Sequence, residues 1–212
     1  MCPKQLIVMK KVLFILATVF SGYFAQAQVQ SFGPTAGFNY AWLSDLSNTS
    51  GRPSFNAGFT YNYSILESAG IGIEARYSEE GVKQDIGNAT LTTKLNYIRV
   101  PLKFQYFFGK LGQDFRPKVF VGPSFAFLVG GKSEIRSGET TTTINSKDAY
   151  EGFDVGLHAG AGFNYRLAER TWLNFDVAYT HGLLDVAGSK SGSDAQNRLV
   201  NVNLGVAFGF GE

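Results

Sequence analysis

The feature that most constrains the fold is an alternation with a period of two residues, which recurs from about residue 32 onwards. From Phe55 to Ile65, apolar residues occupy the odd positions, and Asn, Gly, Thr or Ser occupy the positions between them. Successive side chains of a β-strand point to opposite faces, so the pattern predicts strands with one apolar and one polar face. We expect eight such strands, at residues 32–43, 55–65, 71–78, 98–106, 119–129, 153–167, 173–179 and 200–210.

The connections between these runs alternate between long and short. Long connections are expected at residues 43–54, 79–93, 130–151 and 182–198, and shorter ones at 66–70, 108–116 and 168–171. An up-and-down barrel would place every long connection at one rim and both chain ends at the other. Outer-membrane barrels are built in this way, with long extracellular loops and short periplasmic turns. A two-sheet sandwich is the remaining alternative, although its connections would not alternate so regularly.

The size of the apolar side chains indicates which face is outside. Each strand has two sets of alternate positions, called here its apolar and polar parity. Twenty aromatic rings fall on the apolar parity, and they cannot fit inside an eight-stranded barrel, whose lumen is only just wide enough for side chains or one small ligand. The other parity carries ten of the 25 glycines, which suit a crowded interior. A soluble lipocalin-like barrel is therefore disfavoured. We predict an all-β, eight-stranded antiparallel up-and-down transmembrane β-barrel whose aromatic face contacts lipid. Phe120 and Trp172 fall on the polar parity, which a bulge or a strand-end position would explain.

The N-terminus predicts export. Lys10 and Lys11 precede the apolar run 12–20, and Ala25-Gln26-Ala27 follows it. This is the pattern of a secretory signal peptide cut after Ala27, and the run is too short for a membrane-spanning helix. We therefore expect a signal peptide at residues 1–27, with Met9 as an alternative start, and an outer-membrane β-barrel domain at 28–212.

Cleavage would change the charge of the chain. Three of the 19 basic residues lie in the removed segment, which leaves 16 basic against 17 acidic residues and a net charge of −1. A nucleic-acid partner is not expected from this balance. The single cysteine, Cys2, would also be removed, so the mature chain would have no disulfide and no cysteine nucleophile.

Several stretches resemble the outer-membrane β-barrel domain family often labelled PorT-like. The segment 97–104 (YIRVPLKF) looks like a family strand with the pattern Y-x-E-I-P-L, although Arg99 stands where an acid is frequent. Similar stretches are 121–125 (VGPSF), 153–165 (FDVGLHAGAGFNY), 179–185 (YTHGLLD) and 204–210 (LGVAFGF). The resemblance implies a signal peptide, an eight-stranded barrel and residence in the outer membrane of a Gram-negative bacterium. It implies no single activity.

Charged residues on the lumen parity are the candidate site. The signs are mixed, and an interior ion-pair network explains them better than an ion path, because a buried charge without a partner costs several kcal/mol. In such a network Glu74 or Asp176 would bridge the arginine and lysine side chains of the lumen. The candidates are Glu74, Arg76, Arg99, Lys103, Lys118, Asp154, Arg166 and Asp176.

Catalytic and metal chemistry have weaker support. His158 falls on the lumen parity, and His181 sits near Thr180 and Asp185 at the long-loop rim, but no G-x-S-x-G motif is present. Two histidines and scattered acids give no metal-ligand spacing, so we expect no catalytic residues, no metal and no cofactor.

These observations favour a structural or binding role, with the four long extracellular loops as the interaction surface. The 130–151 loop contains four consecutive threonines, 140–143, which could extend strands into a sheet edge able to pair with another chain. A small porin-like channel is the first alternative, and a lipid-modifying enzyme that uses His181 is the second. Expected partners are outer-membrane lipid and another surface or periplasmic protein, around a monomeric barrel.

Overall fold

The computed structural model describes residues 30–44, 49–186 and 195–210, so the predicted signal peptide and its cleavage site lie outside the described residues. None of the described residues forms a helix that is long and apolar enough to cross a membrane. The elements are β1 (Gln30–Leu43), β2 (Thr49–Ser64), β3 (Ala69–Ile86), β4 (Ala89–Phe107), β5 (Phe115–Ser137), β6 (Thr140–Asn145), the 3-10 helix η1 (Lys147–Ala149), β7 (Phe153–Ala168), β8 (Thr171–Gly182) and β9 (Asn197–Phe210).

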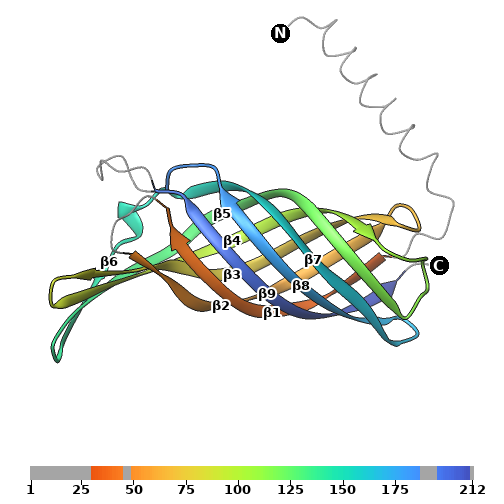
Figure 1. Ribbon diagram of the computed structural model, residues 1–212, viewed down its shortest axis with the longest axis horizontal. Coiled ribbons are helices and arrows are strands. Elements are labelled where there is room, and N and C mark those ends of the chain that lie inside the picture. Colours follow the sequence, from red (N-terminus) through yellow and green to blue (C-terminus); the bar gives the residue numbers. More distant parts are fainter. Residues whose placement is uncertain (1–29, 45–48, 187–194, 211–212) are drawn as a thin grey trace, which may run out of the picture.

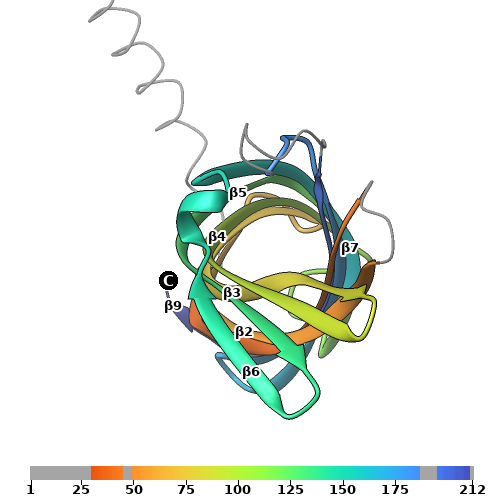
Figure 2. The ribbon, with the colours of Figure 1, turned by 90° about the vertical axis from the view of Figure 1, so that its left-hand side faces the viewer.

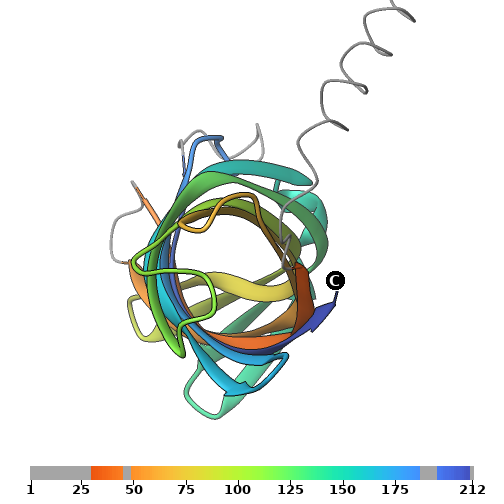
Figure 3. The same cartoon turned by 90° about the vertical axis from the view of Figure 1, so that its right-hand side faces the viewer.

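Eight of the nine described strands close into an antiparallel ring. The sheet runs β4-β3-β2-β1-β9-β8-β7-β5, and a further pairing of β4 with β5 completes it. The ring is seen end-on in Figures 2 and 3. The remaining strand, β6, pairs only with the outer part of β5. The structure therefore confirms the eight-stranded up-and-down barrel and adds a short ninth strand to it.

The two ends of the barrel differ as predicted. Short turns at 65–68, 108–114 and 169–170 lie at the end where β1 begins and β9 finishes. This end is on the right in Figure 1. Two hairpins project from the opposite end, one formed by β3 and β4 and the other by β5 and β6. We call these four projecting strand segments, residues 79–86, 89–96, 130–137 and 140–145, the extension.

The extension corrects the prediction of long loops. Most of 79–93 is a β-hairpin that turns at residues 87–88, with Gly87 at a φ of 60°. Residues 49–54 belong to β2, and 130–151 contains the end of β5, all of β6 and η1. The strands continue because backbone pairing does not stop at the membrane surface. The alternation fades there because water contacts both faces, so neither face has to be apolar.

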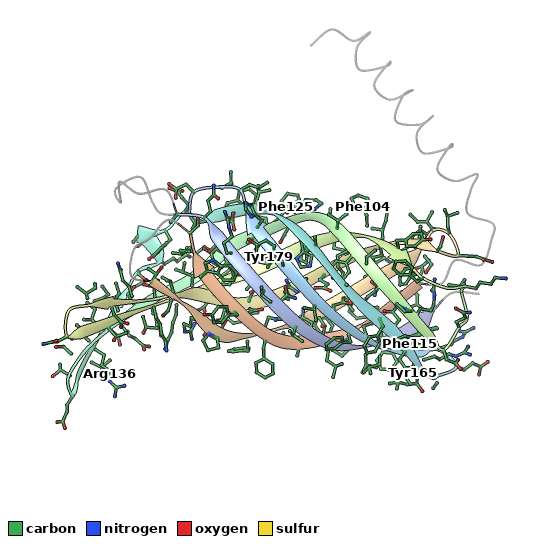
Figure 4. All side chains as sticks on the ribbon, viewed as in Figure 1. Phe104, Phe115, Phe125, Arg136, Tyr165 and Tyr179 are labelled. Carbon is green, nitrogen blue, oxygen red and sulfur yellow. The ribbon has the colours of Figure 1, made fainter. Side chains whose placement is uncertain are left out.

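The barrel wall carries an apolar outer band. Phe104, Phe125 and Tyr179 lie on this wall in Figure 4, with Phe115 and Tyr165 towards one end. The outer side of β7 carries Phe153 near one end and Tyr165 near the other, twelve residues apart. At about 3.3 Å per residue and a tilt of about 45°, these rings are separated by about 28 Å along the barrel axis. That spacing matches the apolar band of about 25 Å between the aromatic girdles of outer-membrane barrels.

Glycines on the inner face let side chains fill the lumen. A Cβ atom added at Gly160 on β7 would overlap the carbonyl oxygen of Val177 and lie 2.6 Å from the ring of Phe120. Phe120 is 4% exposed, so this aromatic residue of polar parity is a lumen residue. Trp172 instead lies near a strand end, opposite Arg166 and next to a register shift in the β7–β8 pairing, and its ring lies close to Gly209.

We predict that Gly160→Ala destabilises the barrel by about 1–3 kcal/mol, because the added methyl group must displace β8 backbone or the Phe120 ring. The matched control is Gly152→Ala, since no heavy atom lies within 4 Å of a Cβ built at that position. Urea unfolding in lipid vesicles, followed by tryptophan fluorescence, measures both. Equal unfolding free energies for the two variants would contradict the predicted packing.

Candidate functional site

The upper part of the lumen network is centred on Arg99. This guanidinium, which is fully buried on β4, donates two hydrogen bonds of 2.8 Å to the carboxylate of Glu80 on β3. It also lies 3.6 Å from Asp154 on β7 and donates to the Ser124 hydroxyl on β5 (3.2 Å). Asn197 on β9 donates to Asp154 (3.1 Å). Five strands are thus tied together by a single buried cation and its partners.

The lower part of the network is a chain of alternating charges. Arg76 donates to Glu74 (3.0 Å), and Lys103 forms an ion pair with the same carboxylate. Lys103 also contacts Asp176 (3.0 Å), which in turn pairs with Lys118 (2.8 Å). Glu74 and Asp176 therefore each bridge two cations, in the way the sequence suggested. The chain crosses from β3 and β4 to β8 and back to β5, through the interior of the barrel.

The central network is electrically balanced. Seven of the eight predicted residues lie in it, but Arg166 lies at the short-turn rim, where its half-exposed side chain pairs with the exposed Asp114. Glu80, which the sequence pattern places in a loop, takes a lumen position because β3 continues to Ile86. With Glu80 included and Arg166 left out, the network contains four cations (Arg76, Arg99, Lys103 and Lys118) and four carboxylates (Glu74, Glu80, Asp154 and Asp176). This balance keeps eight buried charges paired in a narrow space.

An aromatic pair fills the space beside the lower charges. The ring of Phe120 stacks on His158 with a centroid distance of 5.6 Å, and Lys103 Nζ lies 5.0 Å from the Phe120 centroid. His158 is 1% exposed, and its Nδ1 lies 2.8 Å from the Thr180 hydroxyl. His158 therefore has a packed structural position, on the lumen side where sequence parity placed it.

Both ends of the network are covered. Towards the extension, Val186 and Ala195 are fully buried against Leu43 and Val82, and Tyr150 packs against this group. Tyr150 also packs against a second apolar cluster that contains Leu95, Tyr97, Ala126 and Leu128. Towards the short-turn end, Gln105 donates to Asn62 (2.8 Å), and the Arg116 guanidinium lies 4.3 Å from the ring of Phe107.

His181 lies on the outer side of the wall, away from the lumen charges. Its Nδ1 lies 3.3 Å from the hydroxyl of Tyr179, and the two rings pack edge to face. The imidazole is thus directed at a phenol on the lipid-facing wall and not at a serine or threonine hydroxyl. The described residues contain no group of three histidine, cysteine, aspartate or glutamate side chains placed to hold a metal ion.

The extension is the second candidate site. It forms a four-stranded sheet in which β2 pairs with β3 at one side, while β6 forms the other edge. All six residues of β6 are exposed. On its outward face, Lys94 donates to Glu134 (2.6 Å), and this hydrogen bond holds the pKa of the Glu134 carboxyl below its usual value. Arg136 lies on the same projecting hairpin (Figure 4).

We predict that Asp176→Asn destabilises the folded barrel by about 3–5 kcal/mol, because it leaves the buried Lys118 without its ion pair. Asp114→Asn is the matched control. It breaks the exposed pair with Arg166 and should cost about 1 kcal/mol or less. Unfolding free energies in vesicles test both, and a cost for Asp176→Asn as small as that of the control would contradict the proposed role of the network.

The chain is similar in sequence to known outer-membrane proteins. Residues 24–188 match the family model of the outer membrane protein beta-barrel domain. Outer membrane protein W of Vibrio cholerae is 27% identical over 157 residues, which are 74% of this chain and 69% of that protein. The PorT-like label is tested by neither match and stays a prediction.

Solved structures share the fold. The outer membrane protein OprG from Pseudomonas aeruginosa superposes with a TM-score of 0.57 at 15% identity, covering 87% of this chain and 96% of that one. A major outer membrane protein from Thermus thermophilus gives a TM-score of 0.57 at 13% identity, covering 87% of this chain and all of that one. The sequence match and the closed barrel together place the protein in the outer membrane of a Gram-negative cell. The chain belongs to the outer membrane protein beta-barrel domain family.

Proposed function

We propose that the protein is a binding barrel whose filled lumen supports the extension, and that β6 binds an extended segment of another surface protein. The observation that carries this proposal is the free edge of β6. Among the described strands, β6 pairs only with β5, and its other side has no partner. An exposed sheet edge is a template for strand addition, in which main-chain hydrogen bonds supply affinity.

The register indicates which groups a partner would meet. Ser137 pairs with Thr140 across the turn, and the Ser146 N–H donates to the Gly131 carbonyl at the base (3.1 Å). Hydrogen-bonded and non-hydrogen-bonded pairs alternate along an antiparallel ladder. The N–H and C=O groups of Thr141 and Thr143 therefore point away from β5, towards the free edge.

The sequence of β6, TTTTIN, contains none of the usual protections of an edge strand. It has no charge and no proline, although charged residues and proline commonly prevent edge pairing. Threonine has a high strand propensity and can form cross-strand pairs with another threonine. This chemistry fits a partner segment that is extended and rich in β-branched or small polar residues.

The lumen supports a binding role over the alternatives. A channel would need a continuous polar path, whereas eight paired charges and a covering of apolar residues occupy the interior described above. A lipid-modifying enzyme would need a nucleophile beside His181, and the histidine contacts Tyr179 instead. We therefore propose that the protein has no enzymatic activity.

We predict that Thr141→Pro/Thr143→Pro abolishes partner capture. Proline removes the two outward N–H groups while leaving the pairing with β5 in place. A photocrosslinking residue at Glu139 in intact cells, followed by mass spectrometry of the crosslinked products, identifies the partner segment.

The matched control is Thr141→Val/Thr143→Val, which keeps both N–H groups and should keep the crosslink. Loss of the crosslink in both double variants would point to side-chain recognition and contradict strand addition. A crosslink that survives in the proline variant would contradict the proposal outright.

A further inference from the structure

A hollow opens at the base of the extension, where β6 leaves β5, and residues from both faces of the sheet line it. Its volume is about 280 Å³, and it is bounded by main chain at Gly130 and Gly131. The side chains around it come from β5, β6 and the start of η1. Val129 is lipid-facing and 47% exposed, and the rest of the lining is formed by Lys132, Thr143, Ile144, Asn145 and Lys147.

A β-bulge forms the hollow. The β4–β5 pairing shifts register between Asn96 and Tyr97, where Asn96 pairs with Gly130 and Tyr97 pairs with Leu128. Val129 is thus an extra residue on β5. Bulges bend a strand and redirect its side chains, and they are frequent next to functional sites. The bulge lies just below the base of β6, where Lys132 still pairs with Asn145 and the Ser146 N–H still donates to the Gly131 carbonyl (3.1 Å).

The hollow has more cations than anions around it, although the charge of Lys132 also acts on the Glu134 carboxyl and contributes to lowering its pKa. Lys132 lies directly opposite Lys94 across the β4–β5 pair, an arrangement that is destabilising for like charges. Glu134 accepts a hydrogen bond from Lys94 (2.6 Å), and neither Lys132 nor Lys147 forms an ion pair with any described residue. The Asn145 side-chain oxygen accepts the Lys147 N–H (3.0 Å), so its amide group is free to donate outwards.

The position of the hollow relative to the membrane suggests its ligand. Phe127, which contacts Phe153 at a centroid distance of 5.2 Å, belongs to the aromatic girdle nearest the extension. Val129 and Lys132 follow it by two and five residues, which places them about 5 and 12 Å further along the barrel axis. The polar headgroup layer adds about 5–7 Å to each side of the hydrocarbon core, so Val129 lies within this layer and the main chain of Lys132 lies just above it.

We propose that this hollow binds the phosphate of a phosphorylated glycolipid in the surrounding outer leaflet. Lys132 and Lys147 contact the phosphate oxygens, Thr143 and Asn145 donate hydrogen bonds, and Val129 contacts the start of an acyl chain. A lipid is favoured over a soluble anion because the lower side of the hollow is apolar and faces the membrane. Strand addition at β6 is a separate proposal, because it uses main-chain groups at the free edge, whereas Thr143 would contact the phosphate through its side-chain hydroxyl.

The test measures lipid A retention by native mass spectrometry of the purified barrel. We expect the bisphosphorylated lipid to be retained in preference to the same lipid with its phosphates removed. Lys132→Gln and Lys147→Gln should each weaken retention about fivefold, and the double variant about 25-fold, as expected for the loss of one or two lysines near an anionic surface.

The matched control is Lys110→Gln/Arg170→Gln, which removes two exposed cations at the opposite rim and should leave retention unchanged. Electrophoretic mobility with and without boiling verifies that each variant is folded. Equal retention of the dephosphorylated lipid, or equal behaviour of the double variant and the control, would overturn the proposal. Binding of glucose 1-phosphate as tight as that of lipid A would overturn the assignment to a membrane lipid.

Discussion

The pairing of charge inside a narrow barrel is the constraint on which the rest of the structure depends. Eight strands enclose a space that side chains must fill, and here much of that filling is ionised. Arg99 joins β4 to its neighbour β3 through Glu80, and Lys103 joins β4 to β3 through Glu74 and to the distant strand β8 through Asp176. Removing Asp176 would leave the buried Lys118 without its ion pair, and removing Glu80 would take the closest anion from Arg99, so the network favours a single register.

The outer face obeys a different requirement. Between the aromatic girdles, lipid contacts the wall, and large apolar side chains such as Phe38 (76% exposed) extend from it. The same residues would be a liability in water, where contiguous apolar patches promote association. Beyond the girdles this demand ends, and lysines, threonines and glutamates take over the outward face of the extension. The transition from lipid to water along β5 produces both the hollow at Val129 and the free strand β6.

The sequence predicted the membrane-spanning part of the barrel well, because the period-two pattern exists only where one face meets lipid and the other meets the lumen. The extension was predicted as loop for the same reason: its strands have water on both sides. Gly87-Asn88 was the available signal for a two-residue hairpin, and its recognition would have placed Glu80 on a strand. Arg166 has lumen parity but lies past the end of the filled interior, and parity alone cannot say where a lumen stops. Phe120 was identified as an exception, although only the three-dimensional structure places it between His158 and the lysines.

We propose that the protein serves as a filled scaffold with a free strand edge and charged residues above the membrane. Single-channel recording of the purified wild-type protein in planar bilayers tests most directly whether the paired charges and their apolar covering fill the interior. A filled interior predicts a flat baseline with no sustained conductance steps at moderate voltage. Stable, ion-selective open levels from the intact protein would contradict it.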